Sequence, residues 1–165
     1  MINNARQSAG KTMKLISDEY LIGFIEGEGC FYASIVPSKE TTFGWQVIHF
    51  FKVSQNPCGK NVLLKLQQRL GCGYLKQNAG SLSKDKSLAF VVRNIRDLQD
   101  KVVPFLEGKL IIKNEVFSKF KSILDLVHAK KHLTKKGVEQ VIELAYSMNT
   151  KKRRYKKEKI LKSFS

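Results

Sequence analysis

The sequence has little cysteine. Its three cysteines, Cys30, Cys58 and Cys72, are an odd number and contain no Cys-x-x-Cys pair. They fit neither a disulfide framework nor a cysteine-ligated zinc site, and they favour a reducing interior over secretion.

Long apolar runs are missing as well. No run approaches the roughly 20 residues of a membrane-spanning helix, and residues 1–14 lack the apolar core of a secretory signal. We therefore expect a soluble, intracellular protein without a membrane partner, with the cytoplasm and an organelle both left open.

Acidic residues are scarce relative to basic ones. Fourteen Asp and Glu stand against 30 Lys and Arg, which gives a net charge of +16 and an isoelectric point near 9.9. A positive charge of this size attracts polyanions, and its self-repulsion weakens a compact fold unless a partner neutralises the charge. Nucleic acid is the first partner that it indicates and an anionic membrane the second, while a merely soluble basic surface is the alternative.

The remaining composition indicates one folded domain. The length of 165 residues suits a single domain, and 42% hydrophobic residues with ten Phe and five Tyr argue against disorder. We divide the chain into a flexible arm at residues 1–14, a core at 15–150 and a basic tail at 151–165. The tail carries eight basic residues and one acidic residue. It is a phosphate-gripping segment, a nuclear localisation signal or a solvated helix, and phosphate contact fits the overall charge best.

Hydrophobic periodicity and turn residues predict an α-β-β-α-β-β-α order with further helices. The first helix begins at the N-cap Ser17 and runs to about Gly27. The predicted strands cover residues 30–36, 44–54, 74–78 and 87–93, and two late helices cover 115–129 and 134–148. Expected N-caps of later helices are Asn61, Asn94 and Thr134, and expected helix ends are Gly71 and Pro104.

These elements predict an α+β fold in which one curved, antiparallel four-stranded sheet is open on one face and packed against helices on the other. Because side chains alternate across a strand, polar and basic groups gather on the open face. The residues expected there are Tyr32, Ser34, Gln46, Lys52, Lys76 and Asn78. A curved ribbon of this kind fits the major groove of DNA, so the open face is expected to form a DNA-binding saddle.

Two glycines interrupt the first helix. Gly23 and Gly27 share one helix face, and each costs about 1 kcal/mol in a helix interior. Without a Cβ, two copies of the helix can pack almost in contact, which brings two copies of Glu28 together. Paired carboxylates facing a phosphate backbone suit Mg²⁺, which can activate water and stabilise the reacting phosphate. Taken alone, residues 26–29 are equally a helix that ends in a glycine-rich turn.

The nine residues LIGFIEGEG, at positions 21–29, resemble the signature of the LAGLIDADG homing endonucleases. Further segments resemble that family in the same order, at residues 51–55, 70–74, 104–109, 132–137 and 147–149. The resemblance covers about residues 16–150. It implies the αββαββα fold, DNA cleavage with a divalent metal and, because only one copy of the motif is present, a homodimer.

The resemblance also implies roles for individual residues. Glu28 would be the essential acid and a metal ligand, and the Gly29 carbonyl would assist it. Gln55 would organise water in the active site, unless it only caps the following turn. Lys109 would stabilise charge near the scissile phosphate, unless it is simply one of the many solvated basic residues.

Other positions follow from the same resemblance. Glu26 is expected at a packing contact or a helix end rather than at the metal. Some relatives carry Arg shortly after the Gln55 position, where this chain offers only Lys60. Strand alternation and the resemblance together add Ser38 and Thr41 to the expected DNA contacts. The expected dimer interface consists of Leu21, Gly23, Phe24 and Gly27.

We therefore predict a site-specific homing endonuclease that hydrolyses one phosphodiester on each strand of a long pseudo-palindromic duplex with Mg²⁺. Two alternatives use the same scaffold: an RNA maturase that binds its host intron and does not need Glu28, and a DNA-binding protein that no longer cuts. His128 and His132 are a weaker metal candidate, because no third ligand accompanies their i, i+4 pair.

Overall fold

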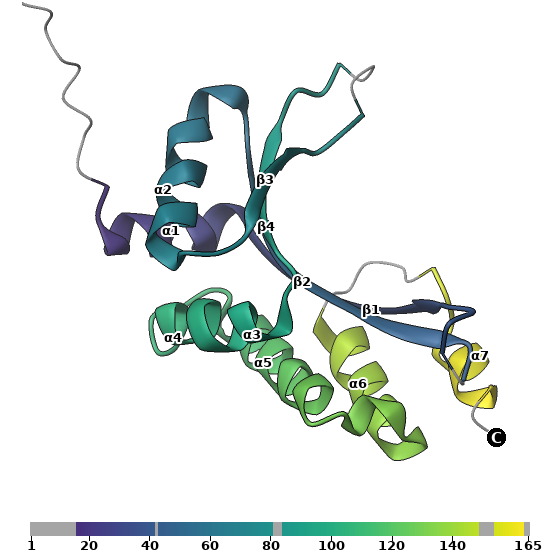
Figure 1. Ribbon diagram of the computed structural model, residues 1–165. Helices are drawn as coiled ribbons and strands as arrows, with labels where there is room; N and C mark the ends of the chain where they lie inside the picture. Colours follow the sequence, from purple (N-terminus) through teal and green to yellow (C-terminus); the bar gives the residue numbers. More distant parts are fainter. Residues whose placement is uncertain (1–15, 42, 81–83, 149–153, 164–165) are drawn as a thin grey trace, which may run out of the picture.

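A four-stranded antiparallel sheet runs through the chain, and helices pack against one of its faces (Figure 1). The computed structural model describes residues 16–41, 43–80, 84–148 and 154–163. The strand order is β1-β2-β4-β3. The strands are β1 (Gly29–Pro37), β2 (Trp45–Gln55), β3 (Tyr74–Gln77) and β4 (Leu88–Val92).

The helices follow the predicted order. The principal ones are α1 (Asp18–Glu28), α2 (Lys60–Leu70), α5 (Asn114–His128) and α6 (Lys135–Met148). Shorter turns connect them: η1 (Pro57–Gly59), α3 (Ile95–Asp97), η2 (Leu98–Val102), α4 (Val103–Leu106) and η3 (Lys131–Leu133). A last helix, α7 (Lys157–Lys162), lies in the basic tail. The α+β architecture and the αββαββα order are thereby confirmed.

The strand register separates the two faces of the sheet. Phe31 pairs with Phe51 and Phe51 with Val92, and these side chains point into the core. Their neighbours point the other way, so that Tyr32 is paired with Phe50 and Lys52 with Val91 on the open face. Alternation from the sequence therefore assigned the two faces correctly.

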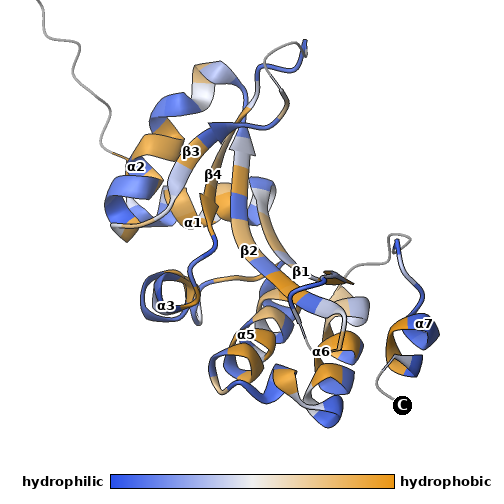
Figure 2. Cartoon of the chain, turned by 45° about the vertical axis from the view of Figure 1, so that its right-hand side comes forward, coloured by the Kyte–Doolittle hydropathy of each residue, from blue (hydrophilic) through white to orange (hydrophobic). Residues whose placement is uncertain are grey.

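The core lies between the sheet and the helices. Phe120, Ile123 and Leu124 of α5 are fully buried, as are Val141 and Ile142 of α6. In Figure 2 both helices carry separate hydrophobic and hydrophilic stripes, as amphipathic helices packed on a sheet should. Helices α5 and α6 contact β1, whereas α2 contacts β2 and β4.

Several helix boundaries follow from local hydrogen bonds. Ser17, Asn94 and Thr134 accept backbone N–H groups of the first turns that they precede, as predicted. Gly71 ends α2 with a left-handed φ of 61°. Two expectations were wrong: α2 begins before Asn61, with Gly59 at its N-cap, and Pro104 lies in the first turn of α4 rather than ending a helix. Proline is tolerated there because first-turn N–H groups have no intrahelical partner.

The tail docks onto the far end of the β1–β2 hairpin. The ring of Tyr155 meets that of Trp45 edge to face at 5.4 Å, and Trp45 Nε1 donates to Ser163 Oγ at 2.6 Å. Ile160 is fully buried in the common core. Residues 154–163 therefore form part of the folded structure, and residues 1–14 and 151–153 lie outside the described residues.

Candidate functional site

The C-terminal end of α1 presents a carboxylate at the surface. Leu21 and Ile25, buried to 1% and 0% exposure, fix α1 on the core, and Glu28 is its exposed last residue. A Cβ added to Gly29 would lie only 2.5 Å from the Ile25 carbonyl oxygen, so this close turn requires glycine. Within the described part of the chain, no hydrogen bond or ion pair engages the Glu28 carboxylate, which leaves its oxygens available to a cation.

Glu26 ties this end of α1 to the start of α5. Its carboxylate oxygens accept the backbone N–H groups of Ile111, Ile112 and Lys113 at 3.2, 2.7 and 3.3 Å. These N–H groups lie directly before α5, where a negative charge is favourable. Glu26 is thus occupied at a helix end, as expected.

Lys113 is a basic residue that the structure places at the C-terminal end of α1. Its Nζ donates to the Glu26 carbonyl oxygen, and to the Gly27 carbonyl oxygen at 3.2 Å. These are terminal carbonyls of α1, where a cation is stabilised by the helix dipole. The sequence analysis missed Lys113, because only the fold shows that the loop before α5 returns to α1.

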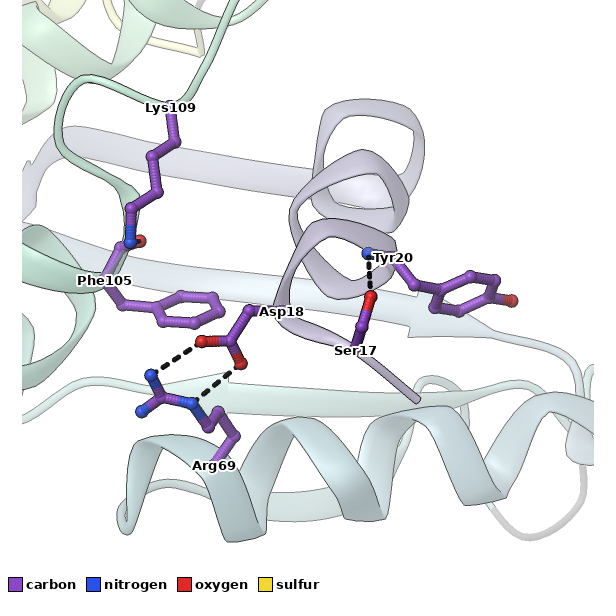
Figure 3. Close-up of polar contacts among 6 residues, drawn as sticks. All are labelled: Ser17, Asp18, Tyr20, Arg69, Phe105 and Lys109. Atoms are coloured by element: carbon purple, nitrogen blue, oxygen red, sulfur yellow. Dashed lines mark hydrogen bonds and ion pairs between the residues drawn. The ribbon is translucent and has the colours of Figure 1, made fainter. Parts of the chain in front are cut away.

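Lys109 lies near the other end of α1, and its predicted role near a scissile phosphate stays a prediction. Its Nζ donates to the Phe105 carbonyl oxygen at 3.0 Å and lies 5.3 Å from the centre of the Phe105 ring (Figure 3). Hydrogen bonds are the main cause of the lowered pKa values of Asp18 and Glu19, in the first turn of α1, and the charge of Lys109 adds a smaller lowering. Ten residues of helix, about 15 Å, separate that turn from Glu28.

The N-terminal end of α1 is held by a separate ion pair. Arg69 of α2 donates from Nε and Nη2 to the two oxygens of Asp18, at 2.8 and 2.7 Å (Figure 3). The hydrogen bonds from Arg69 hold the pKa of the Asp18 carboxyl below its usual value. This pair orients α1 on α2 and lies away from the Glu28 carboxylate.

Gln55 ends β2 two residues beyond Val53, which pairs with Gly29. Its Oε1 accepts the backbone N–H of Asn56 at 2.7 Å, and its side chain packs over Gly59. Gln55 therefore caps this turn, and its amide N–H groups remain potential donors near the α1–β1 junction. Lys60 is exposed at the first residue of α2.

The open sheet face carries the predicted polar set together with apolar groups. The register puts Tyr32, Ser34, Gln46, Lys52 and Lys76 on this face, and none of the four strands contains Asp or Glu. Sequence reasoning missed Phe50 and Arg93, although the same alternation could have found them. A surface without carboxylates beside basic groups suits a polyanion.

Three of the predicted DNA contacts are engaged within the chain. Thr41 Oγ1 donates to the carbonyl oxygens of Trp45 at 2.9 Å and Ser38 at 3.3 Å, and Ser38 Oγ accepts the N–H of Glu40. Asn78 Nδ2 donates to Ser87 Oγ at 3.0 Å. These side chains shape the two hairpin ends, and their role toward DNA stays a prediction.

Within the residues that the structure describes, one face of α1 has no partner. A Cβ added at Gly23 or Gly27 would meet nothing within 4 Å, and Tyr20 on the same face is 54% exposed and stacks on Phe24. Leu21 points away from this face into its own core, so its expected place at a dimer interface is corrected. The face can accept a second helix at short distance.

The histidine pair predicted as a weak metal candidate is not brought together. His128 is exposed at the end of α5, whereas His132 lines a cavity of about 500 Å³ with His49 of β2. Burial, and then the charge of His132, lowers the pKa of His49. Within the described residues, no group of three potential metal ligands forms, and no helix is long and apolar enough to cross a membrane.

Comparisons with known proteins agree with this geometry. The model of the LAGLIDADG endonuclease family matches residues 21–127. The probable intron-encoded endonuclease 3 of Neurospora crassa is 30% identical over 131 residues, which are 77% of this chain and 24% of that protein. The chain spans only about a quarter of the length of the first curated relatives that it matches.

Solved structures match over greater shares of their length. The homing endonuclease I-TnaI has a TM-score of 0.75 and 31% identity, with 92% of this chain and 97% of that chain covered. The archaeal intron-encoded homing endonuclease I-Vdi141I, solved in complex with DNA, has a TM-score of 0.80 and 27% identity, with 89% and 93% covered.

Proposed function

Because this chain belongs to the LAGLIDADG endonuclease family, we propose that it is a site-specific DNA endonuclease that cuts both strands of a long duplex as a homodimer with Mg²⁺. The observation that carries the proposal is the exposed Glu28 carboxylate at the end of α1, directly before β1, for which the described residues offer no partner. A bound duplex would bring its phosphates to this carboxylate.

The sheet supplies the proposed DNA-binding surface. Lys52 and Lys76 lie on its open face, and the net charge of the chain is +16. Contacts to phosphates dominate such affinities, and groups on the strands can reach base edges in the major groove. I-Vdi141I, which shares the fold, was solved with DNA bound, and this supports the assignment.

The oxygen ligands at the end of one α1 helix fit Mg²⁺ only when a second copy of the helix and the DNA supply further ligands. Mg²⁺ is commonly held by one or two carboxylates together with substrate phosphates and water. One chain offers Glu28 and the Gly29 carbonyl oxygen, and a second copy of α1 together with DNA would complete the set. When bound, the ion would lower the pKa of a coordinated water and stabilise negative charge on the reacting phosphate.

The surrounding residues have roles that follow from their positions. The Lys113 ammonium group, held at the terminal carbonyls of α1, would stabilise negative charge that develops on a nearby phosphate. Gln55 has amide N–H groups with which it can orient a water molecule. For Lys109 the proposed role remains stabilisation of charge near the scissile phosphate, as the family resemblance implies.

The dimer is proposed through the free face of α1. Gly23 and Gly27 permit close approach, and Tyr20 and Phe24 flank them with aromatic surface. Such packing would place two copies of Glu28 together, one for each strand. The mass of the protein in solution, measured with and without DNA, tests this step, and a monomer under both conditions would contradict it.

Glu28→Gln tests the proposed chemistry. The variant should bind a selected duplex as wild type does but lose at least about 100-fold in cleavage rate, because the amide is a poor metal ligand. Glu115→Gln, on the exposed surface of α5, is the matched control and should cleave normally. Undiminished cleavage by Glu28→Gln would refute the assignment, and binding of intron RNA without any cleavage of DNA would favour a maturase.

A further inference from the structure

Three side chains form a stacked row on the open face of the sheet. Tyr32 of β1 and Phe50 of β2 are paired residues, with their rings 4.5 Å apart and inclined by only 14°. The guanidinium group of Arg93, the residue after β4, lies 5.4 Å from the centre of the Phe50 ring. The row crosses the face that is proposed to meet DNA.

The two aromatic rings of the row can make only a few kinds of contact with the edges of bases. Phe50 has no hydrogen-bonding group, so it cannot read a donor or an acceptor in the major groove. The only apolar group that the major groove displays is the 5-methyl group of thymine. Partly exposed rings stacked on this face therefore offer the complementary surface for thymine.

The floor beside the row is apolar as well. Ala89 and Val91 point to the open face, and yet they are 0% and 1% exposed, covered by their neighbours. The polar side chains next to these two residues are those of their strand partners, Lys52 opposite Val91 and Lys76 opposite Ala89. Because Ala89 and Val91 are covered, a thymine methyl group would contact the partly exposed rings of the row rather than these two residues.

Arg93 has free donors. It is exposed, and within the described part of the chain neither a salt bridge nor a hydrogen bond engages its guanidinium group. The guanidinium group lies over the Phe50 ring, and its planar fork of N–H donors is suited to bidentate contact with guanine O6 and N7.

The position of the row along the DNA follows from the strands. Phe50 lies three residues from Val53, the partner of Gly29 next to Glu28. At about 3.3 Å per residue this is about 10 Å, or about three base-pair steps. The row would therefore meet each half of the target close to the cleaved bond.

We propose that Phe50 and Tyr32 recognise a thymine methyl group and that Arg93 recognises an adjacent guanine, about three base pairs from the scissile phosphate in each half-site. The proposal rests on the proposed function, since it names part of the DNA sequence that the same sheet selects. It makes these three side chains determinants of specificity rather than of general affinity.

The test begins with wild-type protein and a target selected from a randomised duplex library with Mg²⁺. Single thymines in the half-site are then replaced by uracil, which lacks only the 5-methyl group, and single guanines by 7-deazaguanine, which lacks the N7 acceptor. We expect binding to weaken about threefold to fivefold for one uracil, as for one lost buried methyl group. For one 7-deazaguanine we expect about fivefold or more.

Variants then connect each base to its side chain. Phe50→Ala should abolish the uracil effect and weaken the 7-deazaguanine effect, because Arg93 loses the ring beneath it. Arg93→Gln should abolish the 7-deazaguanine effect and leave the uracil effect. Phe50→Leu, which keeps an apolar surface and perturbs folding less, should retain the uracil effect. Lys52→Gln, a loss of charge on the same face, should weaken binding evenly across all target sequences.

The results separate this inference from the function itself. Wild-type protein that cuts its selected site with equal binding to the uracil and 7-deazaguanine duplexes would overturn the inference and leave the function standing. An unchanged base preference in Phe50→Ala and Arg93→Gln would overturn it as well. Failure of wild-type protein to select or cut any duplex would overturn both.

Discussion

The substitution Glu26→Gln tests how much the hydrogen bonds between α1 and the loop before α5 contribute to stability. The carboxylate of Glu26 accepts three successive backbone N–H groups, from Ile111, Ile112 and Lys113. Glutamine keeps one carbonyl oxygen but turns an amide N–H₂ group toward at least one of these donors. Hydrogen bonds to a charged group contribute about 1.5–3 kcal/mol, and partial exposure of this site reduces their sum.

We therefore expect Glu26→Gln to lower the free energy of unfolding by about 2 kcal/mol. In a chain of this length that corresponds to a fall of roughly 4–8 °C in the melting temperature. Urea unfolding at fixed protein concentration measures the change, because dimer formation makes stability depend on concentration. The exposed Glu115→Gln should change it by less than about 0.5 kcal/mol.

The same substitution should reduce cleavage. Release of the loop would remove Lys113 from the end of α1, so the cleavage rate should fall while binding to the selected duplex changes little. If Glu26→Gln unfolded with the same urea midpoint as the wild type, the reasoning would be refuted, since the three hydrogen bonds would then contribute nothing to stability. Full cleavage by a destabilised variant would show that the loop does not position Lys113.

Three further predictions follow from the structure. Gly29→Ala should lower the free energy of unfolding by about 1–3 kcal/mol, because its methyl group would meet the Ile25 carbonyl oxygen; an unchanged urea midpoint would contradict this. The pKa of His49 is lowered in the folded protein, so the unfolded chain binds more protons as the pH falls below about 6.5 and stability should decrease there. Urea titrations at pH 8 to 5.5 should show this decrease weakened in His49→Leu but retained in His128→Gln, and equal slopes would contradict it. DNA affinity should fall steeply with salt, and Lys52→Gln should reduce the slope of log affinity against log salt by about one; an unaltered slope would exclude a phosphate contact by Lys52.

Local signals in the sequence were sufficient for much of the fold. Ser17, Asn94 and Thr134 were identified as N-caps because a capping side chain acts on residues two or three positions later. The open face followed from alternation, because each strand keeps its period of two. Cap positions and strand faces depend on neighbours in the chain, and such features can be predicted from a single sequence.

Contacts between distant segments could not be predicted in the same way. Lys109 and Lys113 are four residues apart in a region without a clear pattern, and only the docking of the loop on Glu26 decides which of them reaches the end of α1. Leu21 belongs to the signature that suggested an interface, and yet its helix face is set by the core beneath it. A choice between neighbouring residues of this kind needs the tertiary structure.

The docking of α7 has a consequence for synthesis. Trp45 at the β1–β2 hairpin is covered by Tyr155 and bonded to Ser163, 118 residues later. During translation the sheet can form while these residues are still inside the ribosome, and the hairpin end stays uncovered until they emerge. A fusion partner placed directly after Ser163 would crowd the contact between Ser163 and Trp45.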